Sequence, residues 1–189
     1  MPESPARRLF LPQFKAISYA ISNYEELNVL INHFVEGLCR AFKVKGASIM
    51  LYDEREKQLF HVGSYGVSEA YLNKGPVFYD EKQTAFYGGE PVFIDELQRD
   101  PRVQYPSEAT VEGITSMASF PIKCREATIG VLRIYHNTVI RFHADDIDSI
   151  RVLCHLLGLV TENQGLKNFL DRVKSAMGSL PLRMLNGLA

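Results

Sequence analysis

The chain lacks tryptophan, a surplus of charge of either sign, and any apolar run long enough to cross a bilayer. Its 189 residues carry 21 Lys and Arg against 22 Asp and Glu, a formal net charge of −1. This balance argues against a surface built to neutralise phosphates or an anionic membrane. The most apolar stretch, residues 152–160, is too short for a membrane span, and the first residues show no secretory signal. We therefore expect a cytoplasmic protein with no nucleic-acid partner and no membrane attachment.

Cysteine is also scarce, and the three cysteines, Cys39, Cys124 and Cys154, are widely separated. They form neither an even disulfide framework nor a Cys-x-x-Cys pair, so small buried apolar side chains are the favoured interpretation. The five histidines are dispersed, and the sequence contains no glycine-rich phosphate loop and no His-Glu metal motif. The residues therefore indicate no catalytic constellation and no metal site, and they identify no cofactor.

The residues that are present suit one α/β domain with a full core. The chain is 46% hydrophobic and 23% charged, and its length leaves little room for a second domain. Apolar residues recur at helical spacing over 27–42, and Ser22 to Glu25 ahead of them resembles a capping box. A separate leading helix is expected from the spacing of Phe10, Phe14, Ile17 and Ile21.

The C-terminal part of the chain is also predicted to be helical. A cap at His143 precedes Asp145 and Asp146, whose negative charge suits the first turn of a helix. Phe142 and Ile147 stand at the positions of a hydrophobic staple around that cap. After Gly165 an apolar stripe continues through Leu166, Phe169, Leu170, Val173 and Met177.

Strands are expected between these helices. Residues 46–53 and 59–62 form one predicted hairpin, and residues 116–122 and 128–135 form a second across a tight Arg125-Glu126 turn. The middle of the chain, 66–113, is punctuated by glycine and proline and holds one strand, 91–94, among loops and short helices. This order predicts an α+β fold, an antiparallel sheet with terminal helices on one face and looped segments on the other.

In this order and at this spacing, the segments resemble the GAF domain. The resemblance rests on residues 47–53, 89–95 with Asp100-Pro101, 113–116, 121–122, 129–132, 142–146 and 162–163. It covers residues 13–165, with a tail over 1–12 before it and a helical extension with a tail over 166–189 after it. It implies a GAF/PAS-like sheet of six antiparallel strands with a ligand pocket roofed by the middle loops. GAF domains are usually regulatory modules that bind small molecules, often as dimers joined through their terminal helices.

Three specific activities of the family can be compared with this sequence. Cyclic-nucleotide-binding members carry Asn-Lys, Phe and Asp-Glu; here Asn137, Phe142 and Asp146 match, but Thr138 and Ile147 replace the Lys and the Glu. Asn137 and Asp146 also have a purely structural interpretation, as a turn residue and as an acid in the first turn of a helix. Members that attach a tetrapyrrole use a Cys in a stretch that here, over 104–109, has none. Members that reduce free methionine sulfoxide use loop cysteines above the pocket, and residues 66–113 contain none.

Candidate ligand-binding residues follow from strand alternation, because one face of the sheet meets helices and the other the pocket. We expect Arg133 on the pocket face, where its guanidinium needs an anionic partner, either a ligand or a roof carboxylate such as Asp95. Aromatic side chains of the roof, which also include Phe86, are further candidates or a filled satellite core. The full set is Met50, Tyr52, Tyr65, Phe78, Asp95, Tyr105, Thr115, Ser116, Met117, Ser119, Arg133 and Tyr135.

The sequence thus predicts a regulatory, non-enzymatic GAF domain that binds a small, anionic molecule. It is expected to form a homodimer through its terminal helices and to signal through a downstream protein. A ligand-free dimerisation module with a filled pocket is the alternative from another class, and a free methionine sulfoxide reductase is the enzymatic one. An open pocket lined by Arg133 and Tyr135 would favour sensing.

Overall fold

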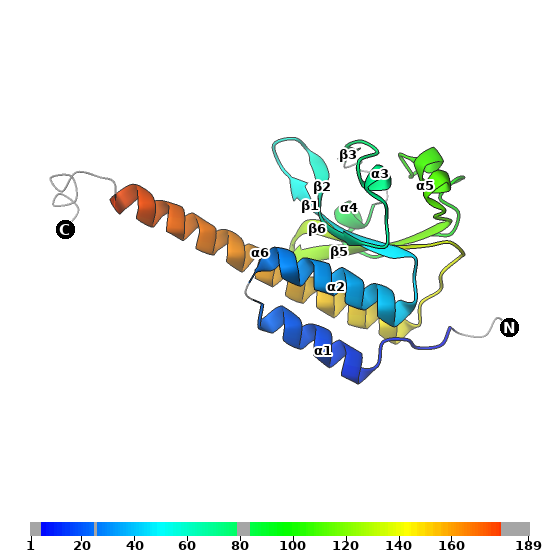
Figure 1. Ribbon diagram of the computed structural model, residues 1–189, viewed down its shortest axis with the longest axis horizontal. Helices are drawn as coiled ribbons and strands as arrows, with labels where there is room; N and C mark the ends of the chain where they lie inside the picture. The colour runs from blue at the N-terminus through cyan, green and yellow to red at the C-terminus, as the bar shows by residue number, and fades with distance from the viewer. Residues whose placement is uncertain (1–4, 25, 79–83, 179–189) are drawn as a thin grey trace.

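The computed structural model describes residues 5–24, 26–78 and 84–178. Within these residues an antiparallel sheet of six strands, in the order β3-β2-β1-β6-β5-β4, separates two layers of helices (Figure 1). The strands are β1 (Gly46–Asp53), β2 (Gln58–Tyr65), β3 (Val77–Phe78), β4 (Val92–Ile94), β5 (Ser116–Cys124) and β6 (Ala127–His136). Both predicted hairpins are present, and the second turns at Arg125, whose φ is 53°.

The long helices lie on one side of the sheet and the short ones on the other, so the predicted fold class is confirmed. Helices α2 (Leu27–Phe42) and α6 (Ala144–Gly178) pack on the strands, and α1 (Leu11–Ser22) packs outside them, against both (Figure 1). The opposite face carries α3 (Glu69–Leu72), α4 (Ala85–Gly88) and α5 (Pro106–Glu112). We call this second layer the roof.

Alternation along β1 and β6 distributes their side chains between the two faces as the sequence predicts. The core beneath α2 and α6 receives Ala47, Ile49, Leu132 and Ile134, whereas the clusters beneath the roof receive Met50, Val131 and Tyr135. Arg133 pairs with Ser48 on β1 and with Ser119 on β5, which places it in the middle of the sheet. The register therefore directs Arg133 toward the roof.

The predicted capping box is wrong. The leading helix α1 continues to Ser22, whose hydroxyl donates to the carbonyl of Ser18 at 3.0 Å, so Ser22 is not available to cap α2. The N-cap of α2 is Glu26, which makes no side-chain capping bond, and Glu25 lies outside the described residues. Burial of one side of α2 from Leu30 to Phe42 stabilises this helix in place of a cap.

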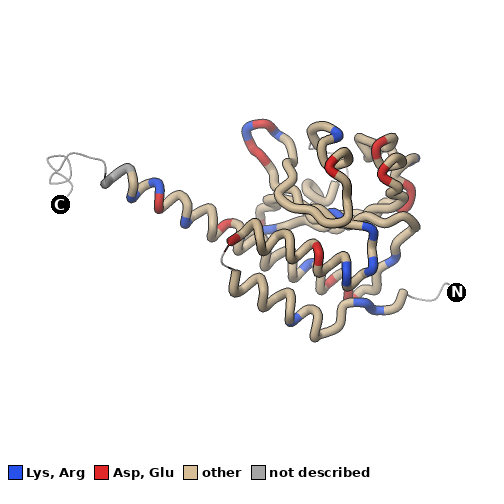
Figure 2. The backbone as a smooth tube through the Cα atoms, viewed as in Figure 1, with Lys and Arg blue, Asp and Glu red and all other residues tan. Residues whose placement is uncertain are grey.

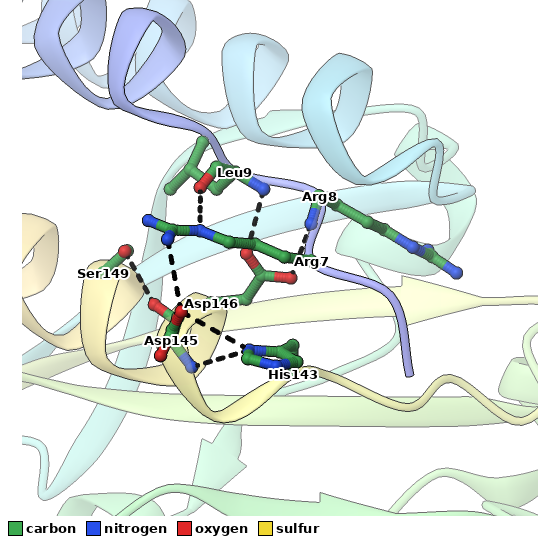
Figure 3. A network of polar contacts seen from close by, with 7 residues as sticks. All are labelled: Arg7, Arg8, Leu9, His143, Asp145, Asp146 and Ser149. Carbon is green, nitrogen blue, oxygen red and sulfur yellow. Dashed lines mark hydrogen bonds and ion pairs between the residues drawn. The ribbon is translucent and has the colours of Figure 1, made fainter. Parts of the chain in front are cut away.

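The segment before α1 is fastened to the first turn of α6 (Figure 3). The backbone amides of Arg8 and Leu9 each donate to the carboxylate of Asp146 at 2.9 Å, and Arg7 pairs with Asp145 at 3.2 Å. The Arg8 guanidinium donates to the carbonyl of Phe42 at the C-terminal end of α2. Asp146, itself buried, thus serves the helix layer and not the roof, which agrees with its interpretation as a helix-start acid.

Helix α6 is one continuous helix of 35 residues that packs on β5 and then projects beyond the body of the domain (Figure 1). Its contact with the sheet is closest at Gly158, where an added Cβ would lie 2.0 Å from the carbonyl oxygen of Lys123. Gly165, farther along, has open space around it. In the described part of the chain, neither this helix nor any other combines the length and the apolar character that a membrane span requires.

Candidate ligand pocket

A cavity of about 390 Å³ lies between the sheet and the roof. Met117 of β5 and Arg133 of β6 contribute to its floor. Tyr71, Lys74 and Phe78 come from the roof segment that contains α3 and β3, and the segment before α5 adds residues 101–105. This volume is at the lower end of the usual range for small-molecule sites, so the cavity suits a small ligand.

The two roof segments are joined to each other by side-chain hydrogen bonds. The Gln104 side chain accepts from the amide of Phe78 at 3.2 Å and donates to its carbonyl at 2.8 Å, as a neighbouring strand would. The Tyr105 hydroxyl donates to the carbonyl of Pro76 at 2.7 Å. Gly75 has a φ of 134°, and a Cβ there would lie 2.6 Å from the Tyr105 hydroxyl, so this approach requires glycine.

Arg133 is the polar centre of the floor. Its Nε atom is buried and has no hydrogen-bond acceptor among the residues that the structure describes. Beside it, the hydroxyls of Tyr135 and Ser48 lie 3.0 Å apart, and both side chains are fully buried. The Tyr71 ring stands edge-on to Tyr135 at 5.7 Å between centroids and covers it. Arg133 therefore reaches the cavity, whereas Tyr135 supports it from below.

The charges that line the cavity are positive. They belong to Lys74, Arg102 and Arg133, and the described lining contains no carboxylate. Asp100 neutralises Arg102 through contacts of 2.5 and 2.8 Å, and the side-chain hydrogen bond lowers the pKa of that carboxyl. Burial and the nearby charge of Arg133 lower the pKa of Lys74 to about 8. An excess of positive charge therefore faces the cavity from Lys74 and Arg133.

His61 adds a third basic group near these two. It lies opposite Met50 in the β1–β2 register, and both of its ring nitrogens are buried without a hydrogen-bond partner in the described structure. Burial, then the charges of Lys74 and Arg133, lower the pKa of His61 to about 4. The imidazole is therefore neutral at physiological pH. Sequence reasoning missed His61 and Lys74. His61 stands two residues after Leu59, so strand alternation places both side chains on the roof side of the sheet. Lys74 directly precedes Gly75-Pro76 in the roof.

The structure brings together only part of the predicted site. Phe78, Tyr105, Met117 and Arg133 line the cavity. Met50, Ser119 and Tyr135 are buried in or beside its floor without lining it, and the Tyr52 ring packs at 4.7 Å from Phe86. Tyr65 ends β2 with 41% of its surface exposed, outside the residues that line the cavity.

Three predicted residues, Thr115, Ser116 and Asp95, bind other partners. Ser116 donates to the carbonyl of Thr138 at 2.6 Å and accepts from the amide of Ile140, because positions 116 and 119 of one strand cannot share a face. Thr115, just before the strand, donates to the carbonyl of Asn137 at 2.9 Å.

Asp95 is not the partner of Arg133. Its carboxylate accepts two hydrogen bonds from Arg141, at 2.9 and 2.7 Å. The sheet order explains this, since Asp95 follows the edge strand β4 and β5 separates that edge from β6.

The cysteines lie away from the cavity. Burial raises the pKa of Cys39 to about 12 and raises that of Cys154 as well. Cys124, at the end of β5, hydrogen-bonds the carboxylate of Glu162, which raises its thiol pKa. Across residues 5–24, 26–78 and 84–178, no group of three or more His, Cys, Asp or Glu side chains is arranged to hold a metal ion.

Comparisons with known proteins give a consistent picture. A family model described as GAF domain matches residues 25–162. The search of curated proteins by sequence found no match. Among solved structures, the GAF domain from the Acinetobacter phosphoenolpyruvate-protein phosphotransferase is similar, with 21% identity, a TM-score of 0.69, and coverage of 82% of this chain and 94% of that one.

Two further solved structures are similar over most of their lengths. A domain of a putative two-component sensor histidine kinase from Sinorhizobium meliloti 1021 has 19% identity and a TM-score of 0.61, over 83% of this chain and 100% of that one. The free methionine-R-sulfoxide reductase from Neisseria meningitidis, in complex with its substrate, has 15% identity and a TM-score of 0.65, over 86% of this chain and 96% of that one. Identity this low shows a shared fold alone.

Proposed function

Because the chain belongs to the GAF domain family, whose model matches residues 25–162, we propose that it is a sensory module that binds a small anion in the roofed cavity. GAF domains are generally regulatory, and solved relatives of this fold come from a phosphotransferase and a sensor kinase protein. The proposal covers a homodimer that signals to a downstream partner through its terminal helices.

One observation carries this proposal: the guanidinium of Arg133 opens into the cavity with its Nε buried and without an acceptor among the described residues. The Arg133 side chain as a whole is half-buried, so the lack of a partner there costs part of the several kcal/mol that a fully buried unpaired charge would cost. The carboxylate that the sequence suggested, Asp95, is engaged by Arg141. An anionic ligand would supply the missing acceptor, and its hydrogen bonds would be strong where water is excluded.

A route from the cavity to the helices runs through the sheet. Arg133 lies on β6, which pairs along its length with β5, and α6 packs on β5. The N-terminal segment is joined to the first turn of the same helix through Asp146. A ligand that draws Arg133 and the roof together would therefore act on strands that α6 contacts directly.

The two alternatives have less support. The ligand-free dimerisation module predicts a filled pocket, whereas a cavity of about 390 Å³ is lined by Arg133, although not by Tyr135. The reductase alternative has a structural relative in the Neisseria enzyme. Thiol chemistry, however, requires an exposed thiolate beside the substrate, and all three cysteines here have raised pKa values and lie outside the cavity lining.

The test is the substitution Arg133→Met, with Arg141→Met as the matched control outside the cavity. If Arg133 serves a ligand, the ligand-free Arg133→Met protein melts at or above the wild-type temperature, because an unpaired buried charge is removed. It also loses the thermal shift that anions give to the wild type, whereas Arg141→Met keeps that shift. A thermal-shift screen of carboxylates and phosphates on the three proteins measures both effects. The proposal fails if no anion shifts the wild type while Arg133→Met is strongly destabilised.

A further inference from the structure

The cavity receives positive charge from two opposite sides. Arg133 projects from the floor strand β6, and Lys74 follows α3 in the roof; both line the cavity. The Lys74 ammonium donates to the carbonyl of Tyr71 at 2.9 Å and lies 3.9 Å from the centre of the Tyr71 ring. It also lies 5.8 Å from the centre of the Tyr105 ring. These contacts orient the ammonium without neutralising it.

Among the described residues, no carboxylate forms an ion pair with Lys74 or Arg133. Glu108 and Glu112 of α5 are close enough to act on Lys74, and Arg133 acts on it in the opposite direction with a larger effect than either carboxylate alone. Glu112 is already engaged, since its carboxylate pairs with Lys45 at 3.3 Å and accepts from the amide and hydroxyl of Ser68. Arg102, the other basic residue of the lining, is paired with Asp100. Within the described part of the chain, Lys74 and Arg133 are thus the two cations of the lining that no ion pair neutralises.

We propose that Lys74 and Arg133 form a two-cation cradle that selects a doubly charged oxyanion, a phosphate monoester or a small dicarboxylate, over a singly charged one of the same size. This inference rests on the proposed function, because it assumes that Arg133 contacts an anion. A monoanion would leave one of two adjacent cations unpaired in a site of low polarity, whereas a dianion pairs both.

The cradle couples ligand binding to protonation. With Arg133 beside it and no ligand, Lys74 has a pKa of about 8, so half of the ammonium groups have lost their proton at that pH and most have lost it a unit above. A bound dianion favours the charged ammonium and raises this pKa, so binding takes up a proton above pH 8. A phosphate monoester loses its second proton near pH 6, so affinity for the dianion is highest between about pH 6 and pH 8 and falls by up to about tenfold per unit above pH 8. The other titratable or charged groups near Lys74 are Tyr71, Tyr105, Glu108, Glu112 and Arg133.

His61 does not contribute to the break near pH 8. Its pKa of about 4 is depressed by burial and by the two cations, so the imidazole is neutral in the range where Lys74 titrates. The break near pH 8 therefore belongs to Lys74.

The experiment compares ligand pairs that differ in charge and little in size. Succinate and its monoamide, succinamate, form one pair, and phenyl phosphate and its methyl ester form the other. Calorimetry at pH 7 and pH 9, in buffers of different ionisation enthalpy, gives both the affinity and the number of protons taken up. For the wild type we expect a preference for the dianion of roughly tenfold or more, with proton uptake at pH 9 only. The pair that shows the larger preference identifies the anion as a dicarboxylate or a phosphate monoester.

Two substitutions of Lys74 separate charge from structure. Lys74→Gln should reduce the dianion preference to near one and abolish proton uptake at pH 9. Lys74→Arg keeps the charge but does not titrate in this range, so it should keep the preference and lose the break near pH 8. This second variant keeps the test decisive if Lys74→Gln fails to fold, since a role in folding alone would not remove the break.

The outcomes distinguish this inference from the proposed function. Equal binding of dianion and monoanion that depends on Arg133 leaves the proposed function in place and overturns the cradle, as does a preference that survives in Lys74→Gln. If neither member of either pair binds to the wild type, both the anion-binding function and the cradle are wrong.

Discussion

The surroundings of each cysteine thiol favour its protonated form. Cys39 and Cys154 are buried in the core beneath the helices, and Cys124 donates to the carboxylate of Glu162, so the pKa of each is raised. A raised pKa leaves little thiolate near neutral pH, and the thiolate is the form that reacts. The raised pKa of Cys124 follows from a carboxylate 38 residues away, whereas that of Cys39 follows from burial and from Glu36 on the same helix.

We therefore expect the substitution Cys124→Ser to leave anion binding unchanged. We also expect the wild type to show no reduction of free methionine sulfoxide in the presence of dithiothreitol, followed by chromatography of methionine. The serine keeps a hydroxyl donor for Glu162, so stability should change by less than about 1 kcal/mol. Methionine formation by the wild type that disappears on replacing any one of the three cysteines would show that the protein is an enzyme.

For individual residues, the sequence predicts the direction of a side chain better on a regular strand than in the roof. Alternation placed Arg133 on the pocket face correctly, because β6 is an uninterrupted central strand. The same alternation along β5 places Ser116 and Ser119, three residues apart, on opposite faces of the sheet, so both cannot line the pocket. Lys74 could not be assigned in this way, because its position depends on how a short irregular segment folds over Tyr71.

Among the elements, α6 approaches the sheet closely at Gly158. Gly158 allows the helix backbone to approach the carbonyl of Lys123 on β5, where any side chain would collide with backbone atoms. Gly165 lies on the same helix in open space. Both are glycines in a helix interior, where glycine costs about 1 kcal/mol relative to alanine, but only Gly158 has a packing reason.

This pair of glycines gives a matched test of the helix–sheet contact. Gly158→Ala should destabilise the protein by about 1–3 kcal/mol, because the added methyl group forces α6 away from β5. Gly165→Ala should stabilise it by up to about 1 kcal/mol through helix propensity alone. Urea unfolding followed by circular dichroism measures both changes. A Gly158→Ala protein as stable as Gly165→Ala would show that α6 does not approach β5 so closely.

The long elements and the short strand β4 were predictable from the sequence, whereas the individual short helices of the roof were not. Helix α2 and the second hairpin carry apolar periods long enough to identify them. Helices α3 and α4 have four residues each and are capped by Ser68 and Thr84, whose side chains accept a backbone hydrogen bond. So few residues show no period, and their positions depend on packing over the sheet.

Across the whole molecule, two apolar stripes lie beyond the reach of the predicted sheet, one on α1 and one after Gly165, and their environments differ. The side chains of Phe14 and Ile17 on α1 pack against the helix-side core, and Ile21 is buried there, so this stripe is largely satisfied within the chain. The stripe after Gly165 is not: Leu166, Phe169 and Leu170 are 56%, 62% and 54% exposed. The side chain of Met177 lies outside the described residues.

This exposed stripe lies on the part of α6 that projects from the domain (Figure 1). Leu159, Leu166, Leu170 and Val173 fall on one side of the helix by their spacing, and each is at least 37% exposed. The same stretch carries charges of both signs, from Lys167, Asp171, Arg172 and Lys174 (Figure 2). By the same spacing Asp171 and Arg172 lie away from the stripe, and Lys167 and Lys174 lie at its border. Within the described part of the chain, these apolar side chains of the projecting helix are thus left exposed.

We predict that two copies of the chain pair through this stripe as a homodimer, because an isolated helix end of this length gains stability from burying its apolar side. Light scattering at tens of micromolar should give the mass of a dimer, and the melting temperature should rise with protein concentration. Leu170→Glu places a charge in the contact and should yield a monomer. Asn168→Glu adds the same charge on the opposite side of α6 and should remain dimeric. A wild type that stays monomeric at this concentration, or an Asn168→Glu protein that dissociates as readily as Leu170→Glu, would show that the stripe does not pair the subunits.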